Sequence, residues 1–375
     1  MNTILILTNH DGGLFHFRRE VLQALLAENF RVVVCVPEGV YRNQLEEMGC
    51  LYEPTEIERH GMNPIKDFSL FLKYGKLIKK YQPSVILTYT IKPNIYGALQ
   101  ARIRKVPYLV NVTGLGMALQ KNGPVQKLLL FLYRISMKKA ACVFFQNTQN
   151  LDFMKDKRCI HTRTRLLPGS GVNLKEFVPL PYPEADGEVR ILNITRIMKD
   201  KGVEELLAAA ENLHRRYPRV IFEIIGDYEE DSRSDYESKV EELQKNGIIR
   251  YYGYQKDVKR FLNKCHLVVH PTYHEGMSNV LLEAAASARP VAASDISGCR
   301  EIFEDGKGGI AFKPQSTEAL VQALEQFLEL NADRKKEMGA AARSYVEEHF
   351  DREIVIQAYM EEIRRAISDS GKDKK

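Results

Sequence analysis

Short apolar runs alternate with amphipathic stretches along this chain, and the whole pattern occurs twice. In the first half the strand-like runs are residues 3–8, 31–36, 85–89, 108–112 and 142–145. Helical stretches such as 15–29 and 124–140 lie between them, which indicates a parallel sheet covered by helices on both faces. The pattern restarts with strand-like runs at 191–194, 221–225, 249–252, 267–270 and 291–293. The sequence therefore predicts an α/β protein with two doubly wound parallel-sheet domains.

The boundary between the two domains is predicted from proline content. A proline-rich stretch, 179–183, separates the two patterns and is interpreted as a linker. We expect a first domain over residues 1–175, a second over 188–350, and a C-terminal helical segment over 351–375 whose residues 368–375 are disordered. A length of 375 residues suffices for two hydrophobic cores.

Cysteine usage and hydropathy bear on the cellular compartment. The six cysteines form no C-x-x-C pair and have no histidine at metal-site spacing, so we expect reduced, buried thiols in a cytoplasmic protein. Residues 1–8 lack the basic region and the cleavage site of a signal peptide. The longest apolar block, 128–133, is far shorter than the ~20 residues that span a bilayer. An integral membrane protein is not expected.

Charge is distributed unevenly along the chain. Residues 1–170 carry 24 Lys and Arg against 12 Asp and Glu, whereas the remainder carries 30 against 37. A basic first half suits an anionic membrane surface, a lipid diphosphate or nucleic acid, although unequal surface charge without function is an equal alternative. Residues 120–139 combine leucines with basic flanks, which is typical of an interfacial helix or of a core-facing one. The basic flanks favour membrane contact.

One segment, 270–284, joins a strand end, a glycine-containing loop and a helix start. Its two glutamates, Glu275 and Glu283, are eight residues apart, so both can face the same end of the sheet. Ligands of open α/β sheets bind beyond the carboxyl ends of the strands, and a helix N-terminus there offers N–H groups to phosphate. The segment therefore predicts a site for a sugar phosphate. The helix N-terminus would bind the phosphate, and the two carboxylates would accept hydrogen bonds from the sugar hydroxyls.

This segment resembles the E-x7-E motif of retaining nucleotide-sugar glycosyltransferases of the GT-B fold, in glycosyltransferase family 4. The resemblance covers nearly the whole chain and includes residues 169–173, 194–203, 225–227 and 252–258. The first half is most similar to bacterial transferases that add N-acetylgalactosamine or a similar sugar to undecaprenyl-diphosphate-linked acceptors, through residues 16–18, 63–64, 92–94, 97 and 114–116. It implies two Rossmann-like domains facing a cleft, with the C-terminal helix packed back on the first domain.

The donor side needs fixed positive charge, because a leaving diphosphate gains negative charge as the glycosidic bond breaks. Arg196 and Lys201 follow a strand end and are the candidate catalytic cations. Backbone N–H groups of Ser278, Asn279 and Val280 would assist them. These groups would together replace a metal ion, and the sequence contains no acidic pair typical of a metal site. No metal and no cofactor are expected.

The resemblance assigns further roles on the donor side. Glu275 would hold hydroxyls of the donor sugar and Glu283 those of the ribose. Gly226 would let the backbone approach the nucleotide, and Tyr254 and Lys256 would lie near a uracil base, although they are equally well explained as turn residues. The predicted donor site is completed by Gly13, Gly276, Met277 and Asp227.

The acceptor side is predicted in the first domain. Gly12 and Gly13 form a tight turn that in this fold approaches the donor diphosphate. His16, Arg18 and Lys92 could hold an acceptor diphosphate, and Thr113 and Gly114 follow another strand end. Many family members carry a histidine where this chain has Thr113, and threonine cannot act as a base at neutral pH. Any role of that histidine is therefore in doubt here.

The predicted function is a retaining transfer of a sugar, such as N-acetylgalactosamine, from a UDP-sugar to a polyprenyl-diphosphate-linked saccharide in bacterial polysaccharide assembly. The enzyme would act on the cytoplasmic face of the cell membrane as a peripheral protein. Alternatives are a glycosyltransferase for a soluble acceptor and a nucleotide-sugar epimerase of the same fold. Nucleic acid is not an expected partner, because the chain lacks a recognition helix, zinc spacing and an aromatic-basic sheet motif.

Overall fold

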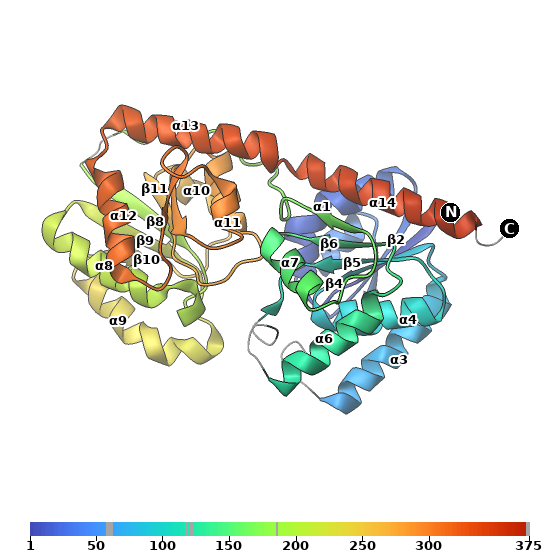
Figure 1. Ribbon diagram of the computed structural model, residues 1–375. Helices are drawn as coiled ribbons and strands as arrows, with labels where there is room; N and C mark the ends of the chain where they lie inside the picture. The colour runs from blue at the N-terminus through green and yellow to red at the C-terminus, as the bar shows by residue number, and fades with distance from the viewer. Residues whose placement is uncertain (58–62, 117–118, 120–122, 185–186, 373–375) are drawn as a thin grey trace. The chain divides into compact units, whose positions relative to one another are not determined.

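The computed structural model describes residues 1–57, 63–116, 119, 123–184 and 187–372 and divides into two compact units (Figure 1). The first unit comprises Met1–Ser170 together with Glu353–Lys375, and the second comprises Gly171–Arg352. Each unit contains one all-parallel sheet with helices on both faces. The repeated alternation in the sequence thus predicts the fold class correctly.

The sheet of the first unit has the strand order β3-β2-β1-β4-β5-β6-β7. Its strands are β1 (Thr3–Leu7), β2 (Arg31–Val36), β3 (Leu51–Pro54), β4 (Val85–Tyr89), β5 (Tyr108–Val112), β6 (Cys142–Phe145) and β7 (Thr164–Leu166). The central strands are buried along their whole length, which explains their continuous apolar runs. The edge strands β3 and β7 are short and more exposed, and for that reason the sequence pattern does not reveal them.

Two helical layers cover this sheet. The helices of the first unit are α1 (Asp11–Ala27), α2 (Arg42–Glu47), α3 (Pro64–Tyr81), the π-helix η1 (Pro93–Gly97), α4 (Ala98–Ile103), α6 (Pro124–Met137), α7 (Thr148–Asp156) and α14 (Arg352–Lys372). Side chains of α3, η1, α4, α6 and α7 share one core with one face of the sheet. Those of α1, α2 and α14 share a second core with the opposite face.

The C-terminal helix α14 joins the first unit although it follows the second unit in the sequence. Val355, Tyr359 and Ile363 repeat at helical spacing and are fully buried against α1 and the sheet. The hydroxyl of Tyr359 hydrogen-bonds to Asn111 Oδ1 at 2.5 Å. The prediction that residue 368 begins a disordered tail is wrong for residues 368–372, because α14 continues to Lys372.

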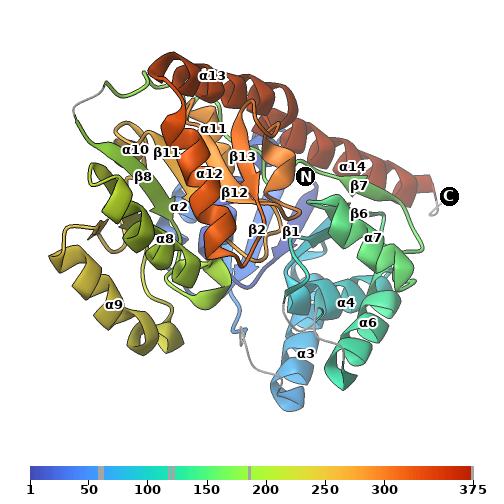
Figure 2. The same ribbon diagram turned by 60° about the vertical axis from the view of Figure 1, so that its left-hand side comes forward.

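The sheet of the second unit has the order β10-β9-β8-β11-β12-β13. Its strands are β8 (Val189–Ile194), β9 (Val220–Ile225), β10 (Ile249–Tyr251), β11 (Leu267–His270), β12 (Val291–Ser294) and β13 (Gly309–Phe312). Its helices are α8 (Val203–Arg216), α9 (Arg233–Lys245), α10 (Lys259–Leu262), α11 (Asn279–Ala286), α12 (Thr317–Glu329) and α13 (Ala332–His349), with short 3-10 turns η2 (Lys199–Lys201), η3 (Glu230–Ser232) and η4 (Arg300–Ile302). Figure 2 shows this arrangement from a second side.

The proline-rich stretch is part of the second unit and is not a free linker. Leu180 donates its N–H to the Ser287 carbonyl at 3.2 Å. The fully buried Arg289 donates to the carbonyls of Leu180 at 3.2 Å and Pro181 at 2.7 Å. Proline content wrongly predicts a linker here. The buried guanidinium of Arg289 hydrogen-bonds the carbonyls of this stretch and so holds it on the second unit.

The cysteines and the hydropathy of the helices can be compared with the expectations from the sequence. Cys35, Cys50, Cys142, Cys159, Cys265 and Cys299 are free and buried, as expected. Within the described ranges no helix is long and apolar enough to span a bilayer.

Candidate active site

The best candidate site lies where the strand order of the second sheet reverses. Strands β8 and β11 are neighbours, yet the chain leaves β8 towards β9 and leaves β11 towards β12. The chain therefore leaves β8 and β11 in opposite directions, and the carboxyl ends of two such strands are where open α/β sheets bind ligands. Arg196 and Lys201 lie on the first of these loops, and Glu275 lies on the second.

Gly202 allows these two loops to touch. Its φ is +69°, and a Cβ at this position would lie 2.0 Å from the carbonyl oxygen of Pro271. No residue other than glycine fits this close approach. The loops are also joined by hydrogen bonds, since the Asp200 carbonyl accepts from the Tyr273 N–H at 2.9 Å and from the Thr272 hydroxyl at 3.3 Å.

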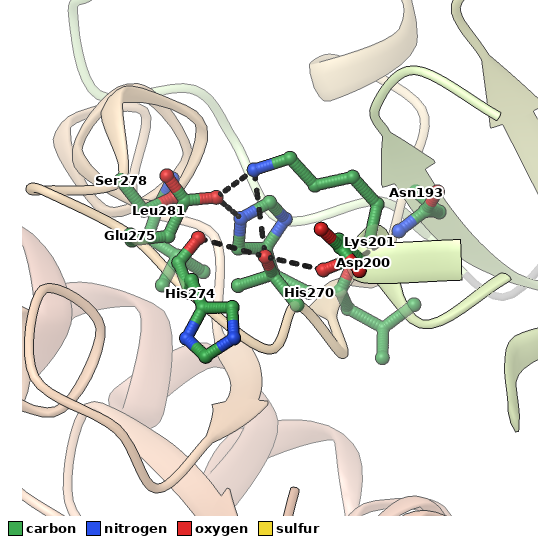
Figure 3. Close-up of polar contacts among 10 residues, drawn as sticks. Asn193, Asp200, Lys201, His270, His274, Glu275, Ser278 and Leu281 are labelled. Atoms are coloured by element: carbon green, nitrogen blue, oxygen red, sulfur yellow. Dashed lines mark hydrogen bonds and ion pairs between the residues drawn. The ribbon is translucent and has the colours of Figure 1, made fainter. Parts of the chain in front are cut away.

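A charged cluster results from this contact. Lys201 Nζ lies 2.5 Å from Glu275 Oε1 and 3.4 Å from Thr272 Oγ1 (Figure 3). His270, buried at the end of β11, places its Nε2 at 3.1 Å from the same Glu275 oxygen. Because an ionised carboxylate only accepts hydrogen bonds, the tautomer of His270 must carry its proton on Nε2.

The cluster keeps Glu275 ionised. Burial alone would raise the pKa of Glu275, but the hydrogen bond from His270 and the charge of Lys201 outweigh it and lower the pKa to about 2. Glu275 is therefore an acceptor for hydroxyl groups over the whole physiological pH range. The Glu275 carboxylate holds Lys201 at the reversal point of the sheet. An anionic group of a ligand could take the place of this carboxylate as the partner of the Lys201 ammonium group.

The start of α11 is fixed by the loop after β12. Ser278 caps the helix through its side chain, which accepts from the Leu281 N–H at 3.3 Å. The Ser278 N–H donates to the Gly298 carbonyl at 2.8 Å. The prediction that this N–H group binds a phosphate is therefore wrong for Ser278. Asn279 and Val280 occupy the first turn of α11, where N–H groups have no partner within the helix.

Glu283 lies on α11, half-buried, one helical turn beyond Asn279. Burial raises its pKa to about 7, since the nearby charge of Arg352 lowers the pKa only in part and that of Glu176 raises it. Lys259 also faces this group and lowers its pKa. The carboxyl of Glu283 therefore changes charge near neutral pH, unlike that of Glu275.

In the first unit, Gly12 and Gly13 lie in the first turn of α1, at the reversal point between β1 and β4. The Gly13 N–H is donated to His10 Nδ1 at 3.1 Å, and the Gly12 N–H to Asp11 Oδ1 at 2.7 Å. Asp11 also accepts from the Tyr41 N–H at 2.7 Å. Both glycine N–H groups therefore have partners within the loop, and the approach of this loop to a donor diphosphate stays a prediction.

The three residues predicted to hold an acceptor diphosphate have separate partners in the structure. His16 is exposed, and its Nε2 lies 2.7 Å from the Tyr41 hydroxyl. Arg18 is buried on another face of α1, where its guanidinium lies over the rings of Tyr89 and Tyr359. Lys92 pairs with Asp67 at 2.7 Å. Residues two apart on a helix point in different directions, so spacing did not favour a joint His16–Arg18 site.

Arg18 instead supports the strand end that carries Thr113. With the Gln146 amide oriented to satisfy both neighbours, its oxygen accepts from Arg18 Nη2 at 2.9 Å and its nitrogen donates to the Thr113 carbonyl at 3.1 Å. Gly114 follows Thr113 beyond the end of β5.

Comparisons with known proteins agree with this geometry. A family described as "Glycosyl transferase 4-like" matches residues 3–147, and one described as "Glycosyl transferases group 1" matches residues 177–345. The structure of HepE of Anabaena in complex with UDP-glucose aligns with a TM-score of 0.81 and 18% identity, over 98% of this chain and 100% of the other. The chain belongs to the GT-B glycosyltransferases of family 4.

Two relatives of this glycosyltransferase act on lipid-linked sugars according to their names. It is 27% identical to the N,N'-diacetylbacillosaminyl-diphospho-undecaprenol alpha-1,3-N-acetylgalactosaminyltransferase of Campylobacter jejuni, over 97% of this chain and 98% of the relative. It is 22% identical to the UDP-Gal:alpha-D-GlcNAc-diphosphoundecaprenol alpha-1,3-galactosyltransferase of Escherichia coli, over 84% of each chain. The glycosyltransferase thus resembles enzymes that extend undecaprenyl-diphosphate-linked glycans.

The other predicted donor residues of the glycosyltransferase lie around the same sheet end. Arg196 is exposed and pairs with Glu229. Gly226 has a φ of +137°, and a Cβ at this position would lie 1.7 Å from the Thr195 carbonyl oxygen. Both the backbone conformation and this close contact between strand ends require glycine. Asp227 is exposed, and its carbonyl accepts from the Ile197 N–H at 2.8 Å. Among the predicted donor residues, the structure joins Glu275 and Lys201 directly, although they were not predicted as a pair.

Four further predicted positions are less closely tied to the site. Tyr254 and Lys256 are exposed on the loop after β10, which fits either of their two interpretations. The Met277 side chain packs in the core of the second unit, so only its backbone remains for a ligand. Gly276 lies against Gly298, where a Cβ at position 298 would be 2.8 Å from the Gly276 carbonyl oxygen.

Sequence reasoning missed His270 and Gly298 of the glycosyltransferase. His270 is the last residue of β11 and lies inside the recognised segment. Its place at a strand end was the signal that could have identified it. Gly298, with a φ of +90°, supports the Glu275 loop from the loop that follows β12. Its role could not be read from local pattern.

Proposed function

We propose that this enzyme is a retaining, metal-independent glycosyltransferase that moves an N-acetylhexosamine, such as N-acetylgalactosamine, from a UDP-sugar to a polyprenyl-diphosphate-linked saccharide. The observation that carries the donor side is the Lys201–Glu275 pair at the reversal point of the second sheet. The names of the Campylobacter and Escherichia relatives support the acceptor class and a role in bacterial surface-glycan assembly. Complexes of HepE with UDP and with UDP-glucose support a UDP-sugar donor.

The proposed reaction breaks the bond between the sugar C1 and the diphosphate and forms one from C1 to an acceptor hydroxyl on the same face. The electron pair of the broken bond goes to the leaving diphosphate, where Lys201 and Arg196 stabilise the new charge. The leaving phosphate accepts the proton of the acceptor hydroxyl, so Thr113 is not required as a base. Glu275 holds hydroxyls of the donor sugar during the transfer.

Metal independence can be tested directly. The proposal assigns the charge compensation of a metal ion to Lys201, Arg196 and the first turn of α11, so we expect full activity in EDTA. The measurement is the initial rate of transfer with EDTA, compared with the rate in added magnesium or manganese. Loss of activity in EDTA and its rescue by either ion would contradict this part of the proposal.

Donor binding is expected to strengthen as pH rises through about 7. Ribose hydroxyls donate to the Glu283 carboxylate, but burial raises the pKa of this group to about 7 in the free protein, so part of it is protonated at neutral pH. Binding favours the ionised form, and kcat/KM for the donor should fall by up to about tenfold per pH unit below 7. Glu283→Gln should weaken donor binding and remove this pH dependence. An unchanged pH profile in Glu283→Gln would exclude Glu283 as its source.

Peripheral attachment to the cytoplasmic face of the membrane is part of the proposal. On α6, Leu128 and Phe131 are exposed, while Leu130 and Tyr133 face the core. The exposed apolar pair supports the proposed membrane contact, and the buried pair explains the core-facing side of the helix. The first part of the predicted interfacial stretch, 120–122, lies outside the described residues. Leu129, which lies between these two faces, is half-buried and packs against the core.

The function is tested by a donor screen. Each UDP-sugar is offered with a synthetic polyprenyl-diphosphate saccharide, and the anomeric configuration of the product is determined. One UDP-N-acetylhexosamine should be transferred with retained configuration. Transfer only to soluble sugars would favour the alternative acceptor class, and isomerised UDP-sugar without transfer would favour an epimerase.

A further inference from the structure

The imidazole of His270 is buried at the carboxyl end of β11, and the proposed reaction gives it no role. Its side chain is 4% exposed, and its Nε2 lies 3.1 Å from Glu275 Oε1 (Figure 3). Its Nδ1 is buried as well and has no hydrogen-bond partner within the described part of the chain. A ring proton on Nδ1 would therefore have no acceptor, whereas a proton on Nε2 has the Glu275 carboxylate. The burial and the contacts of the ring thus fix it as a hydrogen-bond donor to Glu275.

Two neighbours of different kinds contact the same oxygen of Glu275. Lys201 Nζ lies 2.5 Å from Oε1, and its long, flexible side chain comes from the short turn η2. His270 belongs to a buried strand, β11, whose pairing with β12 places it opposite Ala293. The lysine can therefore turn towards another anion by rotating its side chain, whereas the histidine stays where the sheet holds it.

Donor binding changes these surroundings. In the proposed reaction the Lys201 ammonium group stabilises the leaving diphosphate, so it has to turn from Glu275 towards the phosphate oxygens. The Glu275 side chain is only 16% exposed, and a carboxylate in such a site takes up a proton more readily when it loses a cationic partner. A protonated carboxyl is a weaker acceptor for sugar hydroxyls than a carboxylate. The contacts that stay after donor binding therefore decide whether Glu275 still acts as an acceptor.

The ionisable neighbours of Glu275 differ in what they can supply. Cys299 is fully buried, and burial raises the pKa of its thiol well above the ordinary value, so this group is neutral. Glu301, in η4, is itself an acceptor and receives hydrogen bonds from the loop after β12. His270 donates to Glu275 from a strand that does not carry Lys201. Its hydrogen bond is therefore independent of where the lysine points.

We propose that His270 is a positioning residue that keeps the Glu275 carboxylate ionised and in place once the donor diphosphate has drawn Lys201 away. The inference rests on the proposed function, since Lys201 has to meet a diphosphate and Glu275 has to hold hydroxyls of the donor sugar. In the free protein burial raises the pKa of Glu275, and the hydrogen bond from His270 is the largest influence that lowers it, to about 2. Without that hydrogen bond the pKa rises, so the carboxylate is lost as pH falls.

Two substitutions of His270 test this inference in the full chain. In His270→Phe the ring fills the buried place without an N–H group, whereas His270→Gln keeps an amide N–H at a reach similar to that of Nε2. The measurement is kcat against pH at saturating UDP-sugar, which removes the contribution of Glu283 to donor binding. His270→Phe should lose at least about tenfold in kcat at weakly acidic pH and recover most of it as pH rises, because deprotonation of Glu275 restores the acceptor. His270→Gln should keep most of the rate at every pH.

His266→Phe is the matched control. His266 is also buried, but it lies directly before β11, and its Nδ1 accepts from the Arg190 N–H at 3.1 Å. Loss of this imidazole should lower the thermal stability and leave the pH profile of kcat unchanged. His270→Phe should bind UDP with nearly the affinity of the unaltered protein, because Lys201 is intact. An equal fall of kcat at all pH values in both phenylalanine variants, or an unaltered pH profile in His270→Phe, would overturn the proposal.

A second measurement does not depend on turnover and so separates this inference from the proposed function. Carbon NMR follows the isotope-labelled carboxyl of Glu275 with UDP bound, and Glu275→Gln assigns its signal. The carboxyl should titrate at least about one pH unit higher in His270→Phe than in the unaltered protein. Titration at the same pH in both proteins would overturn the inference. If the difference is found but no UDP-sugar is transferred to any acceptor, the proposed function fails and the effect of His270 on Glu275 stands.

Discussion

Lys201→Ala is expected to lower kcat by about 10²–10³-fold at saturating donor, which is the usual loss when one group that stabilises transition-state charge is removed. The protein should remain folded, because Glu275 keeps its hydrogen bond from His270. Steady-state kinetics with a UDP-sugar, together with a thermal melt, measure both effects. Arg196→Ala is expected to act in the same direction, since Arg196 follows the same strand.

The same loop supplies a control for Lys201. Lys199 is exposed, belongs to the same 3-10 turn and lies 3.6 Å from Glu204, away from the Glu275 cluster. Lys199→Ala should keep nearly the full rate. If Lys201→Ala and Arg196→Ala both stay within a few-fold of the unaltered enzyme, the assignment of these cations to the leaving diphosphate is wrong.

Glu275→Gln is expected to produce the other large effect, a loss of kcat of about 10²-fold, because a carboxylate is a much stronger acceptor for sugar hydroxyls than an amide. The same substitution should not weaken the binding of UDP. In the free protein Lys201 pairs with Glu275 at 2.5 Å, and a bound diphosphate must compete for the same ammonium group. Removing the carboxylate charge removes that competition, so UDP should bind equally well or more tightly.

This separation of effects distinguishes a role in the reaction from a role in folding. The measurements are kcat with the UDP-sugar and the dissociation constant of UDP, both with Glu275→Gln. A misfolded variant would lose UDP binding as well as turnover. Parallel losses of both would contradict the roles given to Glu275 and Lys201.

The local sequence pattern predicts the fold class and the buried strands, but it does not predict every segment correctly. Buried strands such as β1 and β11 are continuous apolar runs, and the sequence locates them almost to the residue. The proline-rich stretch was misread as a linker, because the buried Arg289 that holds it comes from a position about a hundred residues later. Long-range hydrogen bonds of this kind leave no trace in local composition.

The candidate site shows the same division. Glu275 and Lys201 were predicted from a motif and from a strand-end position, and the structure joins them through the glycine at 202. The acceptor cations were grouped by their proximity in sequence, and the structure separates the exposed His16 from the buried Arg18. Sequence spacing indicates which strand end a residue follows, but side-chain direction on a helix decides which residues can meet.

The central claim is that the loops after β8 and β11 form the site for the diphosphate of a sugar nucleotide. Calorimetric titration of UDP into the unaltered protein, Lys199→Ala and Lys201→Ala tests it most directly. UDP should bind saturably to the first two, and at least about tenfold more weakly to Lys201→Ala, because one charge-assisted hydrogen bond is lost. Equal affinity of all three proteins for UDP, or no binding to the unaltered protein, would contradict the account.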